Sequence, residues 1–170
     1  ATSSYDRTHV LVLNYLYSLP FFQSAPLWQR SVLAGWQVSG ITSFESGNPF
    51  TVGISGDRAG IGATGQRPNL IGNPARLKGF REYFNTAAFA LPPIGTFGNA
   101  RRSIIRGPGI NDFDISAGKD WGLPERAKLQ FRAEFFNAFN HAQFNSVNST
   151  VGSAGFGQVT GANDPRLVQL

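Results

Sequence analysis

The sequence predicts an all-β fold, an antiparallel up-and-down meander of long strands. The prediction rests on alternating apolar and polar residues, on connections of alternating length, and on the placement of aromatic residues. The clearest alternation covers residues 126–139, where Leu129, Phe131 and Phe135 alternate with charged or amide side chains. Successive side chains of a strand leave opposite faces, so this segment is a strand with one apolar and one charged face. It is about twice as long as the usual five or six residues.

Four further segments show a related pattern and are also predicted to be strands. They cover residues 9–19, 35–46 and 111–121, and the chain after Pro165. The apolar face carries Leu11, Leu13, Tyr15, Tyr17 and Leu19 in the first; Trp36, Val38, Gly40, Thr42 and Phe44 in the second; Phe113, Ile115, Ala117, Lys119 and Trp121 in the third; and Val168 and Leu170 in the last. Pro20 ends the first strand, because proline cannot donate a hydrogen bond to a neighbouring strand.

The connections between these strands alternate in length. They span about 15, 60, 5 and 25 residues, and short turns that alternate with longer loops are typical of outer-membrane barrels. A membrane-spanning strand needs about 9–11 residues, a length that the first four segments reach. We therefore expect a segment of a transmembrane outer-membrane β-barrel of about five strands, with a long extracellular loop at about 52–110.

The aromatic residues give an independent indication of a barrel. Tyr17, Trp36 and Trp121 fall at the strand ends beside the short turns. A second group falls toward the opposite edge and comprises Phe44, Phe50, Phe113, Phe135 and Phe139. Two aromatic belts on either side of an apolar band are the arrangement of membrane barrels.

The composition excludes several other classes of protein. The chain of 170 residues has no Cys and a net charge of +5, which leaves no disulfide framework and no Cys-based metal site. No stretch approaches the roughly 18 uninterrupted apolar residues of a transmembrane helix. His9 and His141 have no second ligand at metal spacing, and no nucleophile with a base and an orienting group can be assembled. We predict no enzyme activity and no cofactor.

Part of the long connection has helical spacing. The residues are Phe80, Tyr83, Phe84, Ala87, Ala88 and Leu91, which recur at intervals of three and four. Pro92 and Pro93 would end such a helix, because the residue before a proline disfavours helical geometry. We expect one or two helical turns packed over the loop.

Two groups of charged residues are candidates for binding. The predicted lumen side carries Glu45, Asp112, Asp114, Lys128, Arg132 and Glu134; these side chains would contact a substrate or pair with one another across strands. The long connection carries Arg101, Arg102 and Arg106, whose guanidinium groups suit the phosphates of lipopolysaccharide. A solvated loop surface is the alternative, and nucleic acid is not expected because no recognised binding motif accompanies the charges.

A soluble or surface β-sandwich that binds glycan or matrix remains the alternative fold. Such a sandwich would also place one apolar face on each strand. Strand length, the two aromatic belts and the asymmetry of the loops favour the barrel.

Several short stretches resemble a known family. They are Gly35-Trp36-Gln37-Val38-Ser39-Gly40-Ile41, Ser46-Gly47-Asn48-Pro49-Phe50, Tyr83-Phe84-Asn85-Thr86-Ala87-Ala88-Phe89, Gly95-Thr96-Phe97-Gly98-Asn99, Arg106-Gly107-Pro108-Gly109 and Phe131-Arg132-Ala133-Glu134-Phe135-Phe136-Asn137. In this order they resemble the TonB-dependent receptors, and among them the Oar-like group, whose N-terminal side carries a carboxypeptidase-regulatory-like domain. The resemblance spans nearly the whole chain.

The resemblance implies the last strands of a large outer-membrane barrel that imports a bulky nutrient. Its partners would be outer-membrane lipid and lipopolysaccharide. The family's plug domain and its TonB-contacting motif lie N-terminal to the region that this sequence resembles. We therefore expect the chain to contact TonB only through other parts of its parent, and to be a fragment that does not transport alone.

Overall fold

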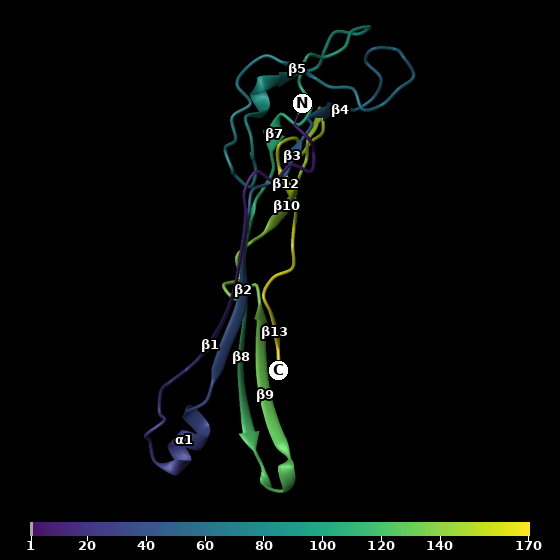
Figure 1. The fold of residues 1–170 in the computed structure, drawn as a ribbon. Coiled ribbons are helices and arrows are strands. Elements are labelled where there is room, and N and C mark those ends of the chain that lie inside the picture. Colours follow the sequence, from purple (N-terminus) through teal and green to yellow (C-terminus); the bar gives the residue numbers. More distant parts are fainter. Residues whose placement is uncertain (1) are drawn as a thin grey trace. The chain divides into compact units, whose positions relative to one another are not determined.

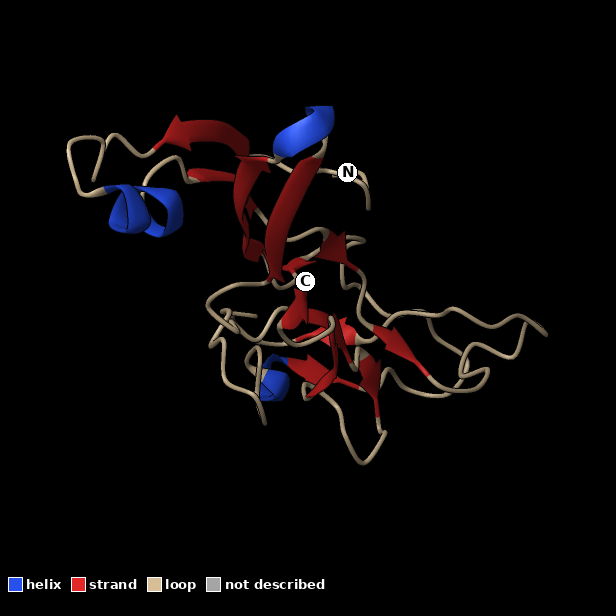
Figure 2. Cartoon of the chain, turned by 90° about the horizontal axis from the view of Figure 1, so that it is seen from below, coloured by secondary structure: helices blue, strands red, loops and turns tan. Residues whose placement is uncertain are grey.

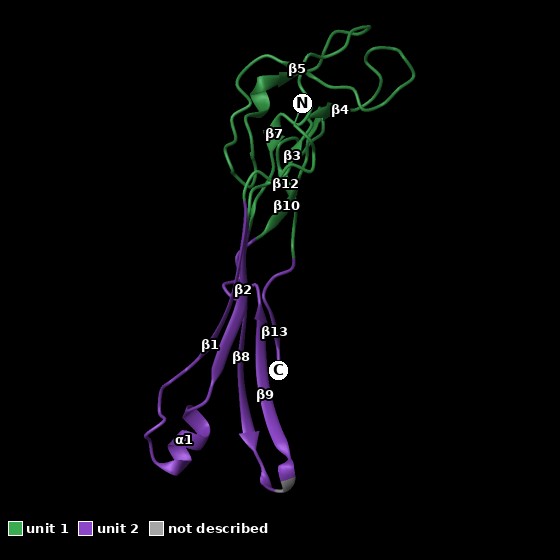
Figure 3. Cartoon of the chain, viewed as in Figure 1, with its two compact units in different colours: residues 1–9, 45–110, 143–163 green, residues 10–44, 111–142, 164–170 purple. Residues whose placement is uncertain are grey.

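The computed structural model describes residues 2–170, apart from the side chain of Glu125. The chain divides into two compact units, shown in separate colours in Figure 3. One comprises residues 10–44, 111–142 and 164–170 and is called here the sheet unit. The other comprises residues 1–9, 45–110 and 143–163 and is called the loop unit.

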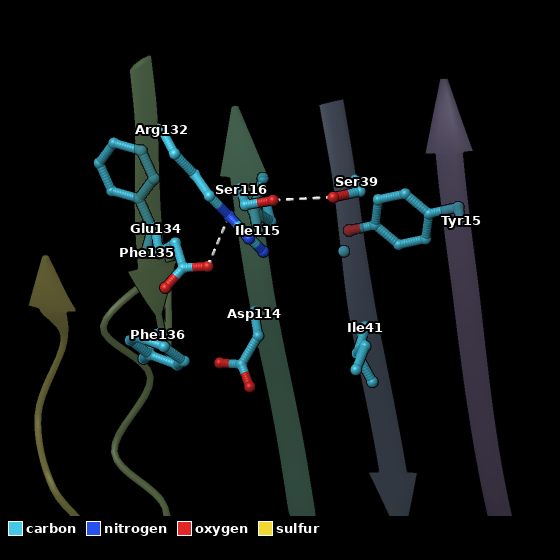
Figure 4. Close-up of a pocket in the computed structure, with 11 residues that line it drawn as sticks. Tyr15, Ser39, Ile41, Asp114, Ile115, Ser116, Arg132, Glu134, Phe135 and Phe136 are labelled. Carbon is cyan, nitrogen blue, oxygen red and sulfur yellow. Dashed lines mark hydrogen bonds and ion pairs between the residues drawn. The ribbon is translucent and has the colours of Figure 1, made fainter. Parts of the chain in front are cut away.

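The sheet unit is built on one sheet of five strands (Figure 1). The strands are β1 (Val10–Ser18), β2 (Gln37–Glu45), β8 (Ile110–Gly122), β9 (Lys128–Phe136) and β13 (Leu167–Gln169). Their order in the sheet is β1-β2-β8-β9-β13, which is also their order along the chain, and neighbouring strands run in opposite directions (Figure 4). The predicted antiparallel meander of long strands is confirmed.

The register between β8 and β9 confirms the predicted faces. Ile115 lies opposite Phe135, and on the next pair Ser116 lies opposite Glu134. Facing residues share one side of a sheet and successive residues alternate, so the apolar and polar sets separate as expected. Strand β13 extends this pattern, because its Val168 lies opposite Phe135 of β9.

The sheet unit leaves its apolar face largely uncovered. Every residue of β1 is exposed, and Leu13 and Leu129 keep 48% and 54% of their surface accessible. The buried hydrophobic cluster of the described residues contains no member of this unit. The sheet is also open, because β1 and β13 each have a single neighbouring strand.

Two short helices lie in the connections between strands of the sheet unit (Figure 2). Helix α1 (Leu27–Leu33) lies between β1 and β2, and the 3₁₀ turn η2 (Pro124–Arg126) lies between β8 and β9. The sequence pattern did not predict α1 in this connection of about 15 residues. Among the described residues, no helix has the length and the hydropathy to cross a membrane.

The loop unit consists of short pairs of strands. Its elements are β3 (Pro49–Phe50), β4 (Gly53–Ile54), β5 (Asn69–Leu70), η1 (Thr86–Ala88), β6 (Phe89–Ala90), β7 (Ile105–Arg106), β10 (Phe144–Val147), β11 (Thr150–Val151) and β12 (Val159–Ala162). Strand β3 pairs with β7, and β5 pairs with β6, so the connection between β2 and β8 folds back on itself. Strand β4 pairs in parallel with β11, which belongs to the connection between β9 and β13. The two long connections are therefore one folded body.

Phe84 lies at the centre of the loop unit's core. Its side chain has no accessible surface, and its ring makes edge-on contacts with Phe50, Phe89 and Phe156 at centroid distances of 5.9, 5.7 and 5.4 Å. Aromatic pairs favour this geometry because the positive ring edge meets the negative face. Val151, from the other long connection, belongs to the same cluster.

Of the one or two helical turns expected around Phe80 to Leu91, one short 3₁₀ turn forms and no α-helix does. Only Thr86–Ala88 makes a single 3₁₀ turn, and the chain continues into β6. Phe80 and Leu91, which would share the buried face of a helix with Tyr83 and Phe84, are exposed, and Phe84 forms an isolated antiparallel bridge with Arg76 instead. The backbone N–H of Tyr83 donates to Gly157 O at 2.8 Å, so contacts with distant segments replace the hydrogen bonds of a helix.

Candidate functional site

The polar face of the sheet unit forms a groove. Its lining residues come from β1, β2, β8 and β9 and from Gly35 just before β2: Leu16, Gly35, Gln37, Ser39, Ser116, Gly118, Lys119, Asp120, Gln130 and Arg132. Lys119 borders the groove although its register places it on the apolar face. Most of these side chains are amides, hydroxyls or charges, as the alternation predicted for the side away from the apolar face. This surface can hydrogen-bond to a polar solute.

A second hollow crosses the same strands farther along and is drawn in Figure 4. Ser39 of β2 and Ser116 of β8 share a hydrogen bond of 2.7 Å between their hydroxyl oxygens. Arg132 Nε lies 2.8 Å from Glu134 Oε1, so these two residues of β9 form an ion pair. Asp114 also lines this hollow. The structure therefore brings together three of the predicted candidates, Asp114, Arg132 and Glu134.

Asp114 also has a structural role. Its Oδ1 accepts a hydrogen bond from the backbone N–H of Asn137 at 3.0 Å, just after β9 ends. Asn137 in turn closes the following turn, because its Oδ1 accepts from His141 N at 2.9 Å and its Nδ2 donates to His141 O at 3.0 Å. Asp114 thus holds the end of β9 beside β8.

The other charged candidates of the predicted lumen side do not line this hollow. Glu45 forms an ion pair with Arg7. Asp112 Oδ1 accepts a hydrogen bond from the adjacent backbone N–H of Phe113 at 3.0 Å. Lys128 lies opposite Gly122 at the far end of β8. These three residues are therefore separate from the group around Arg132.

The three loop arginines have different surroundings. Arg106 forms an ion pair with Asp6, and its Nη1 donates to Asp6 O and to Gly47 O at 3.2 Å each. The hydrogen bond from Arg106 lowers the pKa of the Asp6 carboxyl, against a smaller opposing effect of desolvation. Arg106 therefore ties the N-terminal segment to the loop.

Arg101 and Arg102 are exposed and line a hollow of the loop unit together with Arg67. Arg67 Nη1 donates to Ala100 O at 2.7 Å, so one guanidinium braces the backbone that carries the other two. Among the described residues, no group of three or more acidic, His or Cys side chains could hold a metal ion.

Sequence reasoning missed the environment of Lys119. The residue was placed on the apolar face, and it does lie opposite Phe131, but its side chain is only 5% exposed. Its ammonium donates to Ala34 O and lies 5.2 Å from the centre of the Trp121 ring. A lone Lys two residues before a Trp at the end of an apolar strand face was the available signal.

Comparisons with known proteins agree with this architecture. The family model described as "Outer membrane beta barrel domain" matches residues 1–169. Comparisons with curated proteins and with solved structures gave no match. The family match spans both units, and its description fits a meander in which β1, β2, β8 and β9 are long enough to cross a membrane. The chain belongs to the outer membrane beta barrel domain family and is a segment of such a barrel in the bacterial outer membrane.

Proposed function

We propose that the chain forms part of the wall and outer loops of a TonB-dependent receptor, which takes up a bulky nutrient across the outer membrane. The observation that carries the proposal is the sheet of five consecutive strands, four of them 9 to 13 residues long, with one apolar and one polar face. The family-like stretches from Gly35 to Asn137 support the finer assignment, because they follow the order found in TonB-dependent receptors.

The apolar face would meet lipid, and the polar face would line the lumen. Membrane barrels alternate in this way because acyl chains surround the outside and water fills the inside. The exposure of Leu13 and Leu129 fits this arrangement, since lipid would cover side chains that water would otherwise contact. A soluble sandwich would instead bury this face under a second sheet, so the glycan- or matrix-binding alternative is not favoured.

The loop unit would lie on the cell exterior. The connections before and after β8 differ greatly in length, and the longer loops of membrane barrels are extracellular. Both long connections leave the meander at the same end, because they alternate with the short ones. Long loops are usually functional or disordered, and the aromatic core around Phe84 orders this one. We propose that it helps to admit or hold the ligand.

Ligand contacts in the lumen would come from Arg132, Glu134 and Asp114. Arg132 and Glu134 keep part of their side chains accessible, and an exposed ion pair of this kind exchanges partners at little cost. We propose no catalytic step, cofactor or nucleic acid. Five strands cannot close, because the narrowest membrane barrels need about eight; we therefore infer that further strands complete the wall, and that these residues do not transport alone.

The growth of bacteria tests the proposed transport. Strains with and without the protein, each with and without TonB, are grown on oligosaccharides, oligopeptides or metal chelates too large for open pores. We expect at least one nutrient to support growth only when both proteins are present. Growth that requires the protein but not TonB would show a passive pore. Equal growth of all four strains on every nutrient would contradict nutrient uptake.

Arg101 and Arg102 are proposed to contact lipopolysaccharide phosphates, since one guanidinium group can form two parallel hydrogen bonds to a phosphate. Replacing both by Gln in the membrane protein should lower the amount of lipopolysaccharide that copurifies with it. Arg81→Gln, at another exposed position of the loop unit, is the control. An unchanged yield of lipopolysaccharide in the double variant would contradict this contact.

A further inference from the structure

Helix α1 presents large apolar side chains and buries none of its residues. Leu27 and Trp28 keep 85% and 69% of their surface exposed. The remaining exposed apolar residues of the connection between β1 and β2 are Phe21, Phe22, Val32 and Leu33. We call residues 20–34 the α1 turn. A helix of seven residues with no buried face is not stable in water by itself, so something else must hold and cover it.

Three side chains of the sheet hold the helix by its C-terminal end. Trp36 Nε1 donates to Val32 O at 2.9 Å, Trp121 Nε1 donates to Ser31 O at 2.6 Å, and Lys119 Nζ donates to Ala34 O. The last carbonyl groups of a helix have no partner within the helix, and a cation near them is favourable. The α1 turn is thus fastened to the sheet at the point where it would otherwise fray.

All three donors belong to the apolar face of the sheet. Trp36 makes an edge-on contact with Phe131 at a centroid distance of 5.8 Å, and Lys119 lies opposite the same Phe131. The ring of Trp121 lies beside the Lys119 ammonium, as in cation–π pairs. The α1 turn is therefore attached on the side of the wall that the proposed function assigns to lipid.

We propose that the α1 turn is an interfacial anchor, which inserts its apolar side chains between the phospholipid headgroups and acyl chains of the periplasmic leaflet. This inference rests on the proposed placement of the apolar face against lipid. We assign lipid as the partner of the α1 turn because the turn is attached to that apolar face. Trp is also enriched at membrane–water interfaces. Water alone would leave a patch of six large apolar side chains bare.

The charge of the α1 turn also fits phospholipid. Arg30 is the single charged residue between residues 20 and 34, and it is exposed. Interfacial segments combine an apolar surface with basic residues that meet anionic headgroups. The turn belongs to the short connections of the meander, which are periplasmic in outer-membrane barrels, so the leaflet it meets is the one made of phospholipid.

Spin labels on single cysteines test the anchor directly. The chain has no Cys, so Trp28→Cys and Gln23→Cys can each be labelled in the whole outer-membrane protein, reconstituted into vesicles of phosphatidylethanolamine and phosphatidylglycerol. Trp28 lies on the exposed helix, and Gln23 is an exposed polar residue of the same turn. Collisions with oxygen and with a water-soluble nickel complex then report depth. We expect the label at position 28 to favour oxygen, at about 5–10 Å below the headgroups, and the label at position 23 to favour nickel.

A third label separates this inference from the proposed wall. Leu129→Cys lies on the apolar face of β9, and its label should favour oxygen whatever the α1 turn does. If the label at position 129 reports lipid and the label at position 28 reports water, the anchor alone is contradicted. If the label at position 129 reports water, the proposed placement of the apolar face against lipid is contradicted. On intact cells, labelling of Trp28→Cys by a membrane-impermeant thiol reagent would place the turn outside and contradict its contact with the periplasmic leaflet.

Discussion

The two units of this chain use apolar residues in opposite ways. The loop unit buries a cluster of apolar side chains around Phe84, which includes Phe89, Val52 and Ile105. The sheet unit, in which β1, β2, β8 and β9 are more than twice as long as any strand of the loop unit, leaves comparable side chains exposed on one face. Burial of apolar surface drives folding in water, whereas an apolar face in a bilayer needs no protein partner. The contrast indicates that one unit is adapted to water and the other to lipid.

Loss of the central aromatic ring should have the largest effect. Phe84→Ala removes a fully buried side chain and its three aromatic contacts, so the loop unit should lose about 3–5 kcal/mol of stability. Hydrogen exchange of the loop-unit amides in the purified membrane protein measures this loss. Phe97→Ala, at an exposed position of the same unit, should change stability by less than about 0.5 kcal/mol. Similar costs at both positions would refute a water-adapted core.

A charge placed on either face of β8 tests the role of the sheet unit. Ile115→Arg should destabilise the barrel by about 2–4 kcal/mol if its depth is near the middle of the membrane, because lipid cannot solvate the guanidinium group. Ser116→Arg, the next residue along, should cost far less since it faces the polar side. Unfolding titrations in liposomes provide the comparison, and equal costs would mean that the faces are assigned incorrectly.

The space around two glycines, Gly98 of the loop unit and Gly122 of the sheet unit, predicts a smaller difference. A Cβ atom at Gly98 would overlap the backbone carbonyls of Arg67 and Pro68, whereas one at Gly122 in β8 meets nothing within 4 Å. Gly98→Ala should therefore cost about 1–3 kcal/mol through overpacking. Gly122→Ala should be nearly neutral. Resistance of the loop unit to a protease reports the first effect, and unchanged resistance in Gly98→Ala would contradict this tight packing.

Acid should loosen one loop before it affects the sheet. The Asp57 carboxylate accepts hydrogen bonds from Gly62 N at 2.6 Å, Gly60 N at 2.9 Å and Gln66 Nε2. The bond from Gly62 is the main reason that the pKa of Asp57 lies below its usual value. A lowered pKa in the folded state means that this stabilisation is present above the unfolded pKa of about 3.9 and is lost as pH falls through the folded value.

Cleavage by an acid-tolerant protease near residue 61 measures this change. We expect cleavage to increase as pH falls below about 4, while strands of the sheet unit stay protected. Asp57→Asn is the matched variant: it keeps the shape of the side chain but cannot titrate, so its cleavage should depend much less on pH. Identical pH profiles for both proteins would contradict a role for the carboxylate.

The smallest effect on stability should come from the lumen ion pair. The side chain of Arg132 is 63% exposed, and exposed pairs contribute about 0–1 kcal/mol. Arg132→Gln should therefore leave unfolding in detergent nearly unchanged. If the proposed lumen role is right, the same variant weakens growth on the transported nutrient. A large loss of stability would show that the pair holds the sheet together instead.

The strands were predictable because their information is local. Alternation at a period of two places Ile115 and Ser116 on opposite faces without reference to any partner, and the meander order follows from successive hairpins. The helical turns expected around Phe80 to Leu91 formed only as one short 3₁₀ turn, for the opposite reason. Their spacing was helical, but the backbone of Tyr83 bonds to Gly157 and Phe84 bridges to Arg76, so contacts with other segments replace helical hydrogen bonds. Local periodicity does not report such contacts.

The candidate residues divide in the same way. Their presence on the polar face could be predicted, and the register confirms it for Arg132 and Glu134. The grouping of these two with Asp114, and the separate ion pairs of Glu45 and Arg106, depend on residues far away in sequence. Arg106 forms its ion pair with Asp6, which lies 100 residues earlier in the chain. No spacing rule connects positions so distant.

By itself, the sequence determined the sheet unit: its strands, their faces and their order. These features depend on the alternation of side chains and on the lengths of neighbouring connections, which are both written along the chain. Tertiary structure alone decided which residues form the aromatic core of the loop unit and where helix α1 is attached to the sheet. The helix is held by Trp36, Lys119 and Trp121, two of which lie about 90 residues away. Hydrogen bonds to a helix end require only proximity in space, and folding of the sheet is what brings these donors there.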